Sequence, residues 1–473
     1  MTRMVCPLRA TASRHPNAPA VVGPSGEVLT YKACDSQAQA VAAALRSKGI
    51  EPGNRVAFVG PVEKTTVPIL FGAFRAGVAV YLPNVRMPET ALRERTVRVG
   101  CSHVIGGKTI GIGLPLLDPT ELAGHPSGES PTDMDAGVPA TIIATSGSTA
   151  APKMAVHSVD NHVANAEASN RNITVEPGDR WLLSLSLYHV AGLGIVFRCV
   201  LGGAGFALPN PDEPLEESIA RLNVTHVSLV TTQLQRLLEN RVGTETLRRL
   251  KAILLGGSAI PRGLVERAVH SGVPIHTTYG LTETASQVTT TPPGADMNTL
   301  STSGRPLTRG TVRTAQDGEI EVSGRTLFLG YLTEDGSIYR PATPDGWLPT
   351  GDIGHFDTCE NLVVTGRKDN LFISGGENIQ PEEIEAVLCA FDDVARAIVV
   401  PVPDPEFGHR PLAFIEPAPG FSLNPYYLRR HLGNRLPRYK LPVAYLPWPA
   451  DTRETGIKPS RRFFQELAAQ KWR

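Results

Sequence analysis

The feature that most constrains this 473-residue chain is a repeated alternation of short apolar runs with helical patterns. Near the amino terminus, the apolar run 56–59 is followed by a helix-like segment at 67–76, by Gly77 and by a second apolar run at 78–82. Strands that are apolar on both faces are typical of parallel sheets covered by helices. The alternation returns further along the chain, at 226–230, 233–238, 252–255 and 274–276. It predicts an α/β fold with doubly wound sheets.

The pattern changes after residue 367 and predicts a smaller α+β unit. Pro381 suits the first turn of a helix, a position that proline favours. Two strands are expected next, and then a helix with three leucines on one face; these features lie at 397–400, at 412–415 and at Leu428, Leu432 and Leu436. We therefore predict a boundary near 367–369, which divides the chain into a large domain (1–367) and a small domain (368–473) of ordinary size.

Charge and hydropathy exclude several classes of protein. Lysine plus arginine and aspartate plus glutamate number 46 each, so the formal net charge is zero and gives no electrostatic reason to bind nucleic acid or a membrane surface. The apolar stretch 190–209 has the length of a membrane span, but Arg198 near its middle would be costly in a bilayer. We expect a buried helix and turn there. The amino terminus lacks the apolar run of a secretion signal, so we expect a cytoplasmic protein.

The strongest local motif is Thr-Ser-Gly-Ser-Thr-Ala-Ala-Pro-Lys at 145–153, directly after the apolar residues 142–144. Hydroxyl groups, backbone N–H groups and a lysine on a turn after a strand suit the binding of phosphate. It is not a Walker P-loop, which has glycine directly before the lysine. A Ser/Thr-rich surface turn would also fit the pattern. The candidate phosphate-binding residues are Thr145, Ser146, Gly147, Ser148, Thr149 and Lys153.

Three shorter motifs follow. Tyr-Gly-Leu-Thr-Glu at 279–283 places a carboxylate beside a hydroxyl at a strand end, which could hold Mg²⁺ and contact phosphate; an acidic helix cap would look similar. Thr-Gly-Asp at 350–352 and Gly-Arg-Lys-Asp at 366–369 could contact ribose hydroxyls, although aspartate near glycine often only forms a turn.

The order of these motifs is more specific than any one of them. Together with Gly-Gly-Ser at 256–258 and a late Gly-Ile-Lys at 456–458, the series resembles the adenylate-forming enzyme superfamily of acyl-CoA synthetases, luciferases and peptide-synthetase adenylation domains. The resemblance covers essentially the whole chain. It implies that a carboxylate attacks the α-phosphate of ATP, giving acyl-AMP and pyrophosphate. A thiol, usually that of coenzyme A, then takes the acyl group.

The resemblance also implies roles for residues of the large domain. The 145–153 loop would wrap the β- and γ-phosphates, Thr282 would contact the α-phosphate, and Glu283 would hold the Mg²⁺ that arrives with ATP. Adenine and ribose would be bound by a further set: Gly256, Gly257, Ser258, Tyr279, Gly280, Asp352 and Arg367.

For the small domain, the resemblance implies that Lys458 is catalytic during adenylation and that the domain rotates about Asp369 to admit the thiol. The turn at 374–378, with Gly375 and Gly376, would line the pantetheine tunnel. Two positions depart from the family pattern. Ala150 replaces a usual glycine, and Ile457 separates the glycine and lysine of the C-terminal signature.

The acid pocket is the most variable part of the superfamily. His189 stands where amino-acid-activating members commonly have aspartate, which argues against an amino-acid substrate. The fragments 188–198, 226–234, 280–286 and 373–385 are most similar to the o-succinylbenzoate–CoA ligase branch, which acts in menaquinone biosynthesis. That acid is an aromatic dicarboxylate, and Arg198 could hold the carboxylate that does not react. An internal ion pair is the competing role for Arg198.

We count His189 among the candidate catalytic and substrate-binding residues, as a gate or packing residue rather than a base, and Ser286 as a polar group of the acid pocket. Two alternative functions remain: an acyl- or aryl-CoA ligase for another acid, such as a benzoate or a medium-chain fatty acid, and a non-catalytic nucleotide-binding relative. The expected partners are a small carboxylic acid, ATP and CoA, without nucleic acid or membrane. A homodimer is compatible with the sequence.

Overall fold

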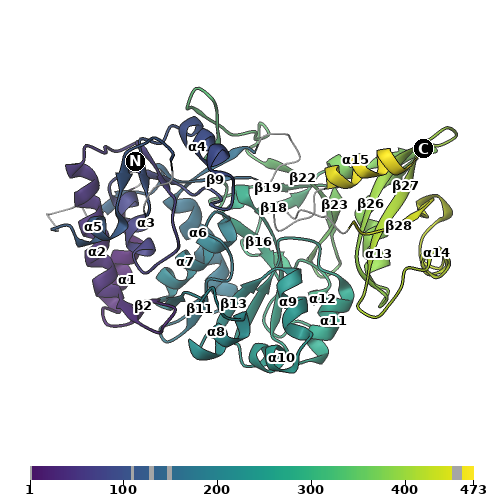
Figure 1. The fold of residues 1–473 in the computed structure, drawn as a ribbon, viewed down its shortest axis with the longest axis horizontal. Helices are drawn as coiled ribbons and strands as arrows, with labels where there is room; N and C mark the ends of the chain where they lie inside the picture. The colour runs from purple at the N-terminus through teal and green to yellow at the C-terminus, as the bar shows by residue number, and fades with distance from the viewer. Residues whose placement is uncertain (1–2, 108–110, 127–132, 146–151, 450–460, 473) are drawn as a thin grey trace.

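The computed structural model describes residues 3–107, 111–126, 133–145, 152–449 and 461–472. Two large mixed sheets form the body of the molecule, and helices α6 (Val159–Asn172) and α7 (Val190–Gly202) lie in its centre (Figure 1). Helix α6 contacts β9 and β10 of one sheet and β16 of the other, while α7 contacts β11, β12 and β16. The two helices therefore join the sheets into one body.

In the first sheet, a parallel core is extended by antiparallel strands at one edge. Helix α3 (Thr66–Arg75) connects β4 to the parallel strand β5, which confirms the strand–helix–strand unit predicted at 56–82. The strand order is β21 (Ile338–Tyr339), β20 (Gly330–Leu332), β10 (Met154–Ser158), β9 (Pro139–Ala144), β5 (Ala79–Tyr81), β4 (Arg55–Phe58), β6 (His103–Ile105), β7 (Leu116–Leu117).

The second sheet confirms the alternation predicted from 226 onward. Its order is β17 (Arg305–Pro306), β16 (Ser286–Thr290), β15 (Ile275–Leu281), β14 (Ala252–Leu255), β13 (His226–Leu229), β11 (Arg180–Leu182), β12 (Gly205–Ala207), β2 (Pro19–Val22), β3 (Val28–Thr30). Helix α9 (Thr231–Leu238) follows β13 as expected. Strand β15 runs past the predicted end at 276 because it pairs with the antiparallel strand β16.

Further helices surround both sheets. They are α1 (Pro7–Arg14), α2 (Tyr31–Ser47), α4 (Glu89–Arg98), α5 (Pro119–Gly124), α8 (Leu215–Arg221), α10 (Arg241–Arg248), α11 (Arg262–His270) and α12 (Met297–Leu300). A short pairing of β1 (Arg3–Val5) with β8 (Asp133–Asp135) completes this side of the molecule.

Local sequence fixes the ends of the two central helices. Ser158 and Asn161 form a reciprocal capping box that starts α6. Helix α7 ends at Gly203, whose φ of 71° lies in the left-handed region that glycine adopts without steric cost. The buried helix and turn predicted at 190–209 are thus confirmed, as α7 and β12. In the described part of the chain, we find no helix with both the length and the apolar character needed to cross a membrane.

Later strands form a third, antiparallel sheet and then smaller ones. The third sheet has the order β18 (Val312–Thr314), β19 (Glu319–Val322), β22 (Leu348–Phe356), β23 (Leu362–Arg367). The short turn η2 (Lys368–Asn370) follows β23. Beyond it lie β24 (Phe372–Ser374), β25 (Glu377–Ile379), α13 (Pro381–Cys389), β26 (Val394–Asp404), β27 (Gly408–Pro417), α14 (Pro425–Gly433), η3 (Arg438–Lys440), β28 (Tyr445–Pro447) and α15 (Arg461–Lys471).

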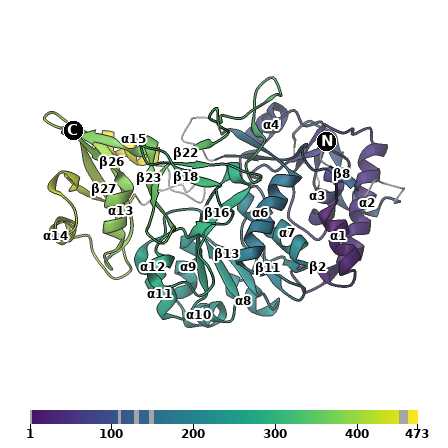
Figure 2. The same cartoon turned by 180° about the vertical axis from the view of Figure 1, so that it is seen from behind.

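These last elements pack at the end of the molecule opposite α1 and α2 (Figures 1 and 2). Their buried apolar clusters contain residues from 372 onward. The predicted helix at 381 and the strands at 397–400 and 412–415 are confirmed as α13, β26 and β27. The helix predicted through Leu436 is too long: α14 ends at Gly433, because Leu436 precedes Pro437, which disfavours helical geometry. The boundary near 367–369 stays a prediction.

Candidate functional site

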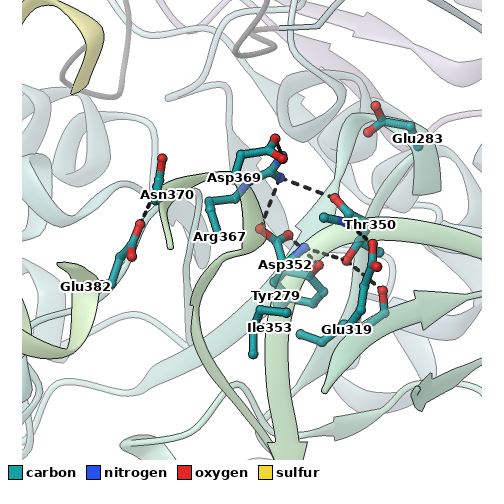
Figure 3. A network of polar contacts seen from close by, with 12 residues as sticks. Tyr279, Glu283, Glu319, Thr350, Asp352, Ile353, Arg367, Asp369, Asn370 and Glu382 are labelled. Carbon is teal, nitrogen blue, oxygen red and sulfur yellow. Dashed lines mark hydrogen bonds and ion pairs between the residues drawn. The ribbon is translucent and has the colours of Figure 1, made fainter. Parts of the chain in front are cut away.

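Three motif residues that lie far apart in the sequence meet at the third sheet. Asp352 on β22 pairs in register with Arg367 on β23, and the Arg367 guanidinium lies 3.1 Å from the Asp352 carboxylate. The phenol of Tyr279, at the end of β15, donates a hydrogen bond of 2.7 Å to the other carboxylate oxygen. Figure 3 shows this cluster, with Glu283 to one side of it. The structure therefore unites residues from three of the predicted motifs.

The turn that presents Asp352 is held by groups that the sequence analysis did not identify. Gly351 has a φ of 73°, and its N–H donates to the Glu319 carboxylate at 2.9 Å. Thr350 donates its hydroxyl proton to the carbonyl of Ile320 at 2.7 Å. Both partners come from β19, whose pairing with β22 cannot be read from a local pattern.

Burial and neighbouring charge keep Tyr279 and Arg367 protonated at neutral pH. Burial, followed by the neighbouring Asp352 carboxylate, raises the pKa of Tyr279 well above its ordinary value, so the phenol remains a donor. Burial lowers the pKa of Arg367, but the Asp352 charge more than offsets this and the net direction is upward. Asp352 retains lone pairs beyond the two it uses here, which leaves acceptor capacity for hydroxyl groups.

Thr282 and Glu283 form the short turn η1 (Thr282–Thr284) between β15 and β16. The Tyr331 phenol donates to the Glu283 carboxylate at 2.5 Å, and the N–H of Phe328 donates to the Glu283 carbonyl at 2.8 Å. The chain passes close to itself here: a Cβ on Gly280 would lie 2.1 Å from the carbonyl oxygen of Ser286. Glycine at 280 is therefore required by the backbone crossing, whatever contact it makes with a nucleotide.

The described ends of the 145–153 loop lie beside this turn. Thr145 donates its N–H to the Lys153 carbonyl at 2.8 Å, and the Lys153 ammonium lies 5.0 Å from the centre of the Tyr331 ring. Since Tyr331 also binds Glu283, the loop and the predicted metal ligand share a neighbour. The predicted residues Ser146, Gly147, Ser148, Thr149 and Lys458 lie outside the described residues.

The predicted adenine-binding residues follow the carboxyl end of β14, the parallel neighbour of β15. A Cβ on Gly256 would lie 2.6 Å from Cγ2 of Thr278, so these two strand ends are packed closely. Gly257 has a φ of 89°, and the Ser258 hydroxyl lies 3.3 Å from that of Thr231. The structure thus sets 256–258 beside the strand that carries Tyr279.

Arg198 on α7 is fully buried, and its charge is not neutralised by an acidic residue. Its Nη2 donates to the Ser286 hydroxyl at 3.1 Å, and the guanidinium lies 5.1 Å from the centre of the Trp181 ring. In the described part of the chain, Nε and Nη1 have no hydrogen-bond partner, and no aspartate or glutamate forms an ion pair with Arg198. Burial lowers the pKa of Arg198 to about 10, so the group is still charged at neutral pH.

Two residues near the start of α7 complete this region. Gly194 makes room for the guanidinium, because a Cβ there would lie 3.0 Å from Nη2 of Arg198. His189 is the N-cap residue of α7, and its ring lies 4.6 Å from that of Tyr188. Burial lowers the pKa of His189, so the imidazole is neutral at pH 7. This environment fits a packing or gating role better than that of a charged group.

The candidate residues of the C-terminal part lie on two turns. Asp369 in η2 is 61% exposed, with a carboxylate oxygen 3.7 Å from the Arg367 guanidinium. Gly375 and Gly376 connect β24 to β25 with φ values of 57° and 86°. The Gly375 N–H donates to the carbonyl of Phe407 at 2.9 Å, which holds this hairpin against β26 and β27.

Comparison with known proteins identifies the family of this chain. Residues 8–332 match the family described as AMP-binding enzyme, and residues 383–452 match its C-terminal domain. The 2-succinylbenzoate–CoA ligase of Salmonella typhimurium is 34% identical over 447 residues, or 94% of either chain. That of Haemophilus influenzae is 34% identical over 449 residues, again 94% of either chain.

Solved structures give the same result. The o-succinylbenzoate CoA synthetase from Bacillus subtilis, in complex with the acyl-adenylate intermediate OSB-AMP, superposes with a TM-score of 0.87 at 28% identity, covering 98% of both chains. The same enzyme in complex with ATP and magnesium ion gives a TM-score of 0.86 at 27% identity, covering 98% of this chain and 99% of that one. The predicted adenylate-forming fold is confirmed. By sequence and by structure, this chain belongs to the AMP-binding enzyme family.

Proposed function

We propose that this chain is an AMP-forming acid–thiol ligase that activates o-succinylbenzoate and transfers it to coenzyme A, a step of menaquinone biosynthesis. The observation that carries this proposal is the environment of Arg198. A fully buried guanidinium with two unpaired nitrogen atoms is costly unless an anion binds it. Relatives of 30–39% identity are named 2-succinylbenzoate–CoA ligase.

A dicarboxylic substrate would supply that anion. One of its carboxylates must stay ionised while the other reacts, and a planar guanidinium pairs well with a carboxylate. Ser286 orients one edge of the guanidinium by accepting from Nη2, and the Trp181 face lies against the group. Among the described residues, no acidic side chain competes for this position, which supports the ligand role over the internal ion pair. A monocarboxylic acid would leave Arg198 unpaired.

In the first step, an oxygen of the reacting carboxylate forms a bond to the α-phosphorus of ATP. The bond from that phosphorus to the bridging oxygen breaks, and pyrophosphate leaves with the electron pair. The protein's part is to position these groups and to stabilise the negative charge. We assign the ribose hydroxyls to Asp352 and Arg367, the phosphates to the 145–153 loop, and the α-phosphate to Thr282.

Glu283 fits the role of a carboxylate ligand for Mg²⁺. The Tyr331 hydroxyl fixes its orientation, and the described residues contain no group of three or more His, Cys, Asp or Glu side chains arranged to hold a metal. A single protein carboxylate is what is expected where substrate phosphates supply further ligands. When bound with ATP, Mg²⁺ would neutralise charge on the phosphates.

In the second step, the thiolate sulfur of CoA attacks the acyl carbon, and AMP leaves as the carbon–oxygen bond breaks. We propose that the division of the chain into 1–367 and 368–473 serves this step, with rotation about Asp369. Lys458 would act in the first step, and the Gly375–Gly376 turn would line the thiol's path in the second. Two glycines with positive φ allow close approach of the backbone.

The partners that we propose are therefore the acid, ATP and CoA, in the cytoplasm, where these metabolites occur. A monomer and a homodimer both fit this proposal, and size-exclusion chromatography of the purified chain distinguishes them.

The proposal is tested by incubating the purified chain with ATP, Mg²⁺, CoA and one acid at a time, and measuring pyrophosphate, AMP and the acyl-CoA product. We expect turnover with o-succinylbenzoate and little with benzoate or a medium-chain fatty acid. Turnover with a monocarboxylate but not with o-succinylbenzoate would contradict the assignment of the substrate.

A further inference from the structure

A buried histidine lies directly beneath the turn that carries Thr282 and Glu283. His157 is on β10, is fully buried, and its Nε2 lies 2.6 Å from the carbonyl oxygen of Thr282. A carbonyl oxygen can only accept, so Nε2 carries the proton and donates it. Nδ1 has no partner among the described residues. The position of the ring is therefore set by the contact with Thr282 and by packing.

The Thr284 hydroxyl bonds to the backbone of residues 281 and 286, but the Thr282 carbonyl has only a long bond from within the turn. The short helix η1 spans Thr282–Thr284, and the next residue, Ala285, has a φ of 57°, which is unfavourable for alanine. Within the turn, the Thr282 carbonyl accepts from the N–H of Ala285 at 3.3 Å, which is longer than the 2.6 Å contact from His157. Contacts from other elements therefore hold the turn in place.

We propose that His157 is a positioning residue for adenylation: its Nε2–H group fixes the Thr282 carbonyl and so orients Thr282 and Glu283 toward the α-phosphate and its Mg²⁺. This inference rests on the proposed roles of Thr282 and Glu283. It goes beyond them because His157 is assigned no contact with substrate or metal and acts through the backbone carbonyl of Thr282. Groups that fix the orientation of a metal ligand without binding the metal typically change metal affinity or activity by about 10- to 100-fold when they are mutated.

The surroundings of His157 suit a fixed donor. Its ring lies 5.1 Å from that of His162 and 6.2 Å from that of Phe328, whose N–H holds the carbonyl of Glu283. The carbonyls of Thr282 and Glu283 are thus held by His157 and Phe328, whose rings pack near each other. Burial lowers the pKa of His157 to about 4, so the imidazole is neutral at pH 7 and adds no charge beside the phosphates.

His162 provides a matched control. It is also buried, and its Nε2 lies 2.8 Å from the Thr141 hydroxyl, while its ring stacks on Phe197 at 4.8 Å. Its hydrogen bond and ring contacts involve Thr141, His157 and Phe197, none of which belongs to the turn at 282–284. Replacing it with phenylalanine removes a buried histidine and one hydrogen bond of a similar kind. The loss of stability caused by removing a buried histidine should therefore be similar in His157→Phe and His162→Phe.

The test compares His157→Phe, His157→Asn, His157→Gln and His162→Phe in the full chain, with ATP, Mg²⁺ and o-succinylbenzoate. The Gln amide can place an N–H near the former Nε2, whereas the shorter Asn amide reaches only the position of Nδ1. We expect the Phe and Asn variants to lose about 10- to 100-fold in adenylation rate and to need a higher Mg²⁺ concentration for half-maximal rate. His157→Gln and His162→Phe should keep the wild-type Mg²⁺ dependence.

Wild-type rate and Mg²⁺ dependence in His157→Asn would overturn the inference, and so would an equal loss in Asn and Gln. Thermal unfolding midpoints measured in parallel identify a variant that does not fold. If His157→Phe does not fold, the comparison of His157→Asn with His157→Gln decides whether the Nε2–H group is needed. Glu283→Gln separates this inference from the proposed function. If that variant is as active as the wild type, the assignment of Glu283 fails; if it is inactive while His157→Asn is normal, only the role of His157 fails.

Discussion

Two buried charged regions of this protein differ in how their charges are neutralised. At the nucleotide side, the Asp352 carboxylate is paired with Arg367 and accepts from Tyr279, all within the protein. At the acid side, Arg198 is fully buried beside Ser286 and Trp181, and no carboxylate of the described chain faces it. A charge that has its own partner stabilises the fold, whereas one without a partner is stabilised when a ligand arrives. Mutation of Asp352 should therefore lower the stability of the fold, whereas mutation of Arg198 should weaken use of the acid without lowering stability.

The largest effect is expected when Arg198 is replaced by methionine. Losing one partner of a buried charge pair costs about 2–5 kcal/mol in binding, which corresponds to a decrease of about 30- to 4,000-fold in kcat/KM for o-succinylbenzoate. The free energy of unfolding should stay the same or rise, because the variant removes an unpaired buried cation. Steady-state kinetics and urea unfolding measure the two quantities.

Arg198→Lys is the control, since it keeps the charge but loses the planar fork, and it should fall between wild type and Arg198→Met. A fall of several kcal/mol in the stability of Arg198→Met, with unchanged use of the diacid, would mean that Arg198 is a structural cation. The contrast between the two regions would then be wrong.

Asp352→Ala, unlike Arg198→Met, should lower the free energy of unfolding. The buried Tyr279 hydroxyl loses its acceptor, which costs about 1–3 kcal/mol of stability. The Arg367 ion pair adds little to that, since the Arg367 side chain is 41% exposed and solvent screens the pair. We also expect KM for ATP to rise by roughly tenfold or more if Asp352 binds ribose.

Asp352→Asn is the matched variant, because its amide oxygen can still accept from Tyr279. It should recover most of the lost stability while ATP binding remains weakened. If the alanine variant unfolds at the wild-type urea concentration, the cluster at Asp352 is not a structural pair, and the difference between the two regions disappears.

A smaller effect is expected for Trp181→Phe. The indole ring lies 5.1 Å from the Arg198 guanidinium, and a contact of this kind contributes about 0.5–2 kcal/mol, more for Trp than for Phe. KM for o-succinylbenzoate should therefore rise by a few-fold, while KM for ATP stays unchanged. Equal changes in both KM values would indicate a general packing defect instead of a specific effect on the acid side.

The sequence predicted the alternating strands and helices well because that pattern is local. The unit at 56–82 and the strands from 226 onward depend on apolar periodicity within each segment, and the structure has them at nearly those positions. The predicted end of α14 is wrong because Pro437, about one turn beyond Gly433, overrides the leucine spacing. Residue roles came from the resemblance of ordered motifs, not from periodicity.

The supporting residues of the site could not be predicted because they act across long sequence distances. Tyr331 reaches Glu283 only because β20 pairs with β10, and His157 reaches Thr282 from the same strand β10. Nothing near either residue in the sequence distinguishes it from an ordinary core aromatic or histidine. Trp181 likewise meets Arg198 through the packing of α7 on β11.

The smallest effect concerns pH and again separates the two regions. Burial lowers the pKa of His162, whose ring stacks on Phe197 of the acid-side helix α7, whereas none of the hydrogen bonds and ion pairs that the described Asp352 carboxylate makes involves a histidine. Between the unfolded pKa of about 6.5 and the lowered folded value, the unfolded chain binds more protons, so stability falls as pH decreases through this range.

We therefore expect urea unfolding midpoints to decrease from pH 7 to pH 5 in the wild type, and to decrease less steeply in His162→Phe, which removes one such imidazole. Asp352→Asn should keep the wild-type slope, because it leaves the buried imidazole of His162 in place. If the pH dependence of the unfolding midpoint were unchanged in His162→Phe but altered in Asp352→Asn, the group responsible would lie on the nucleotide side. The distinction between the two regions would then be reversed.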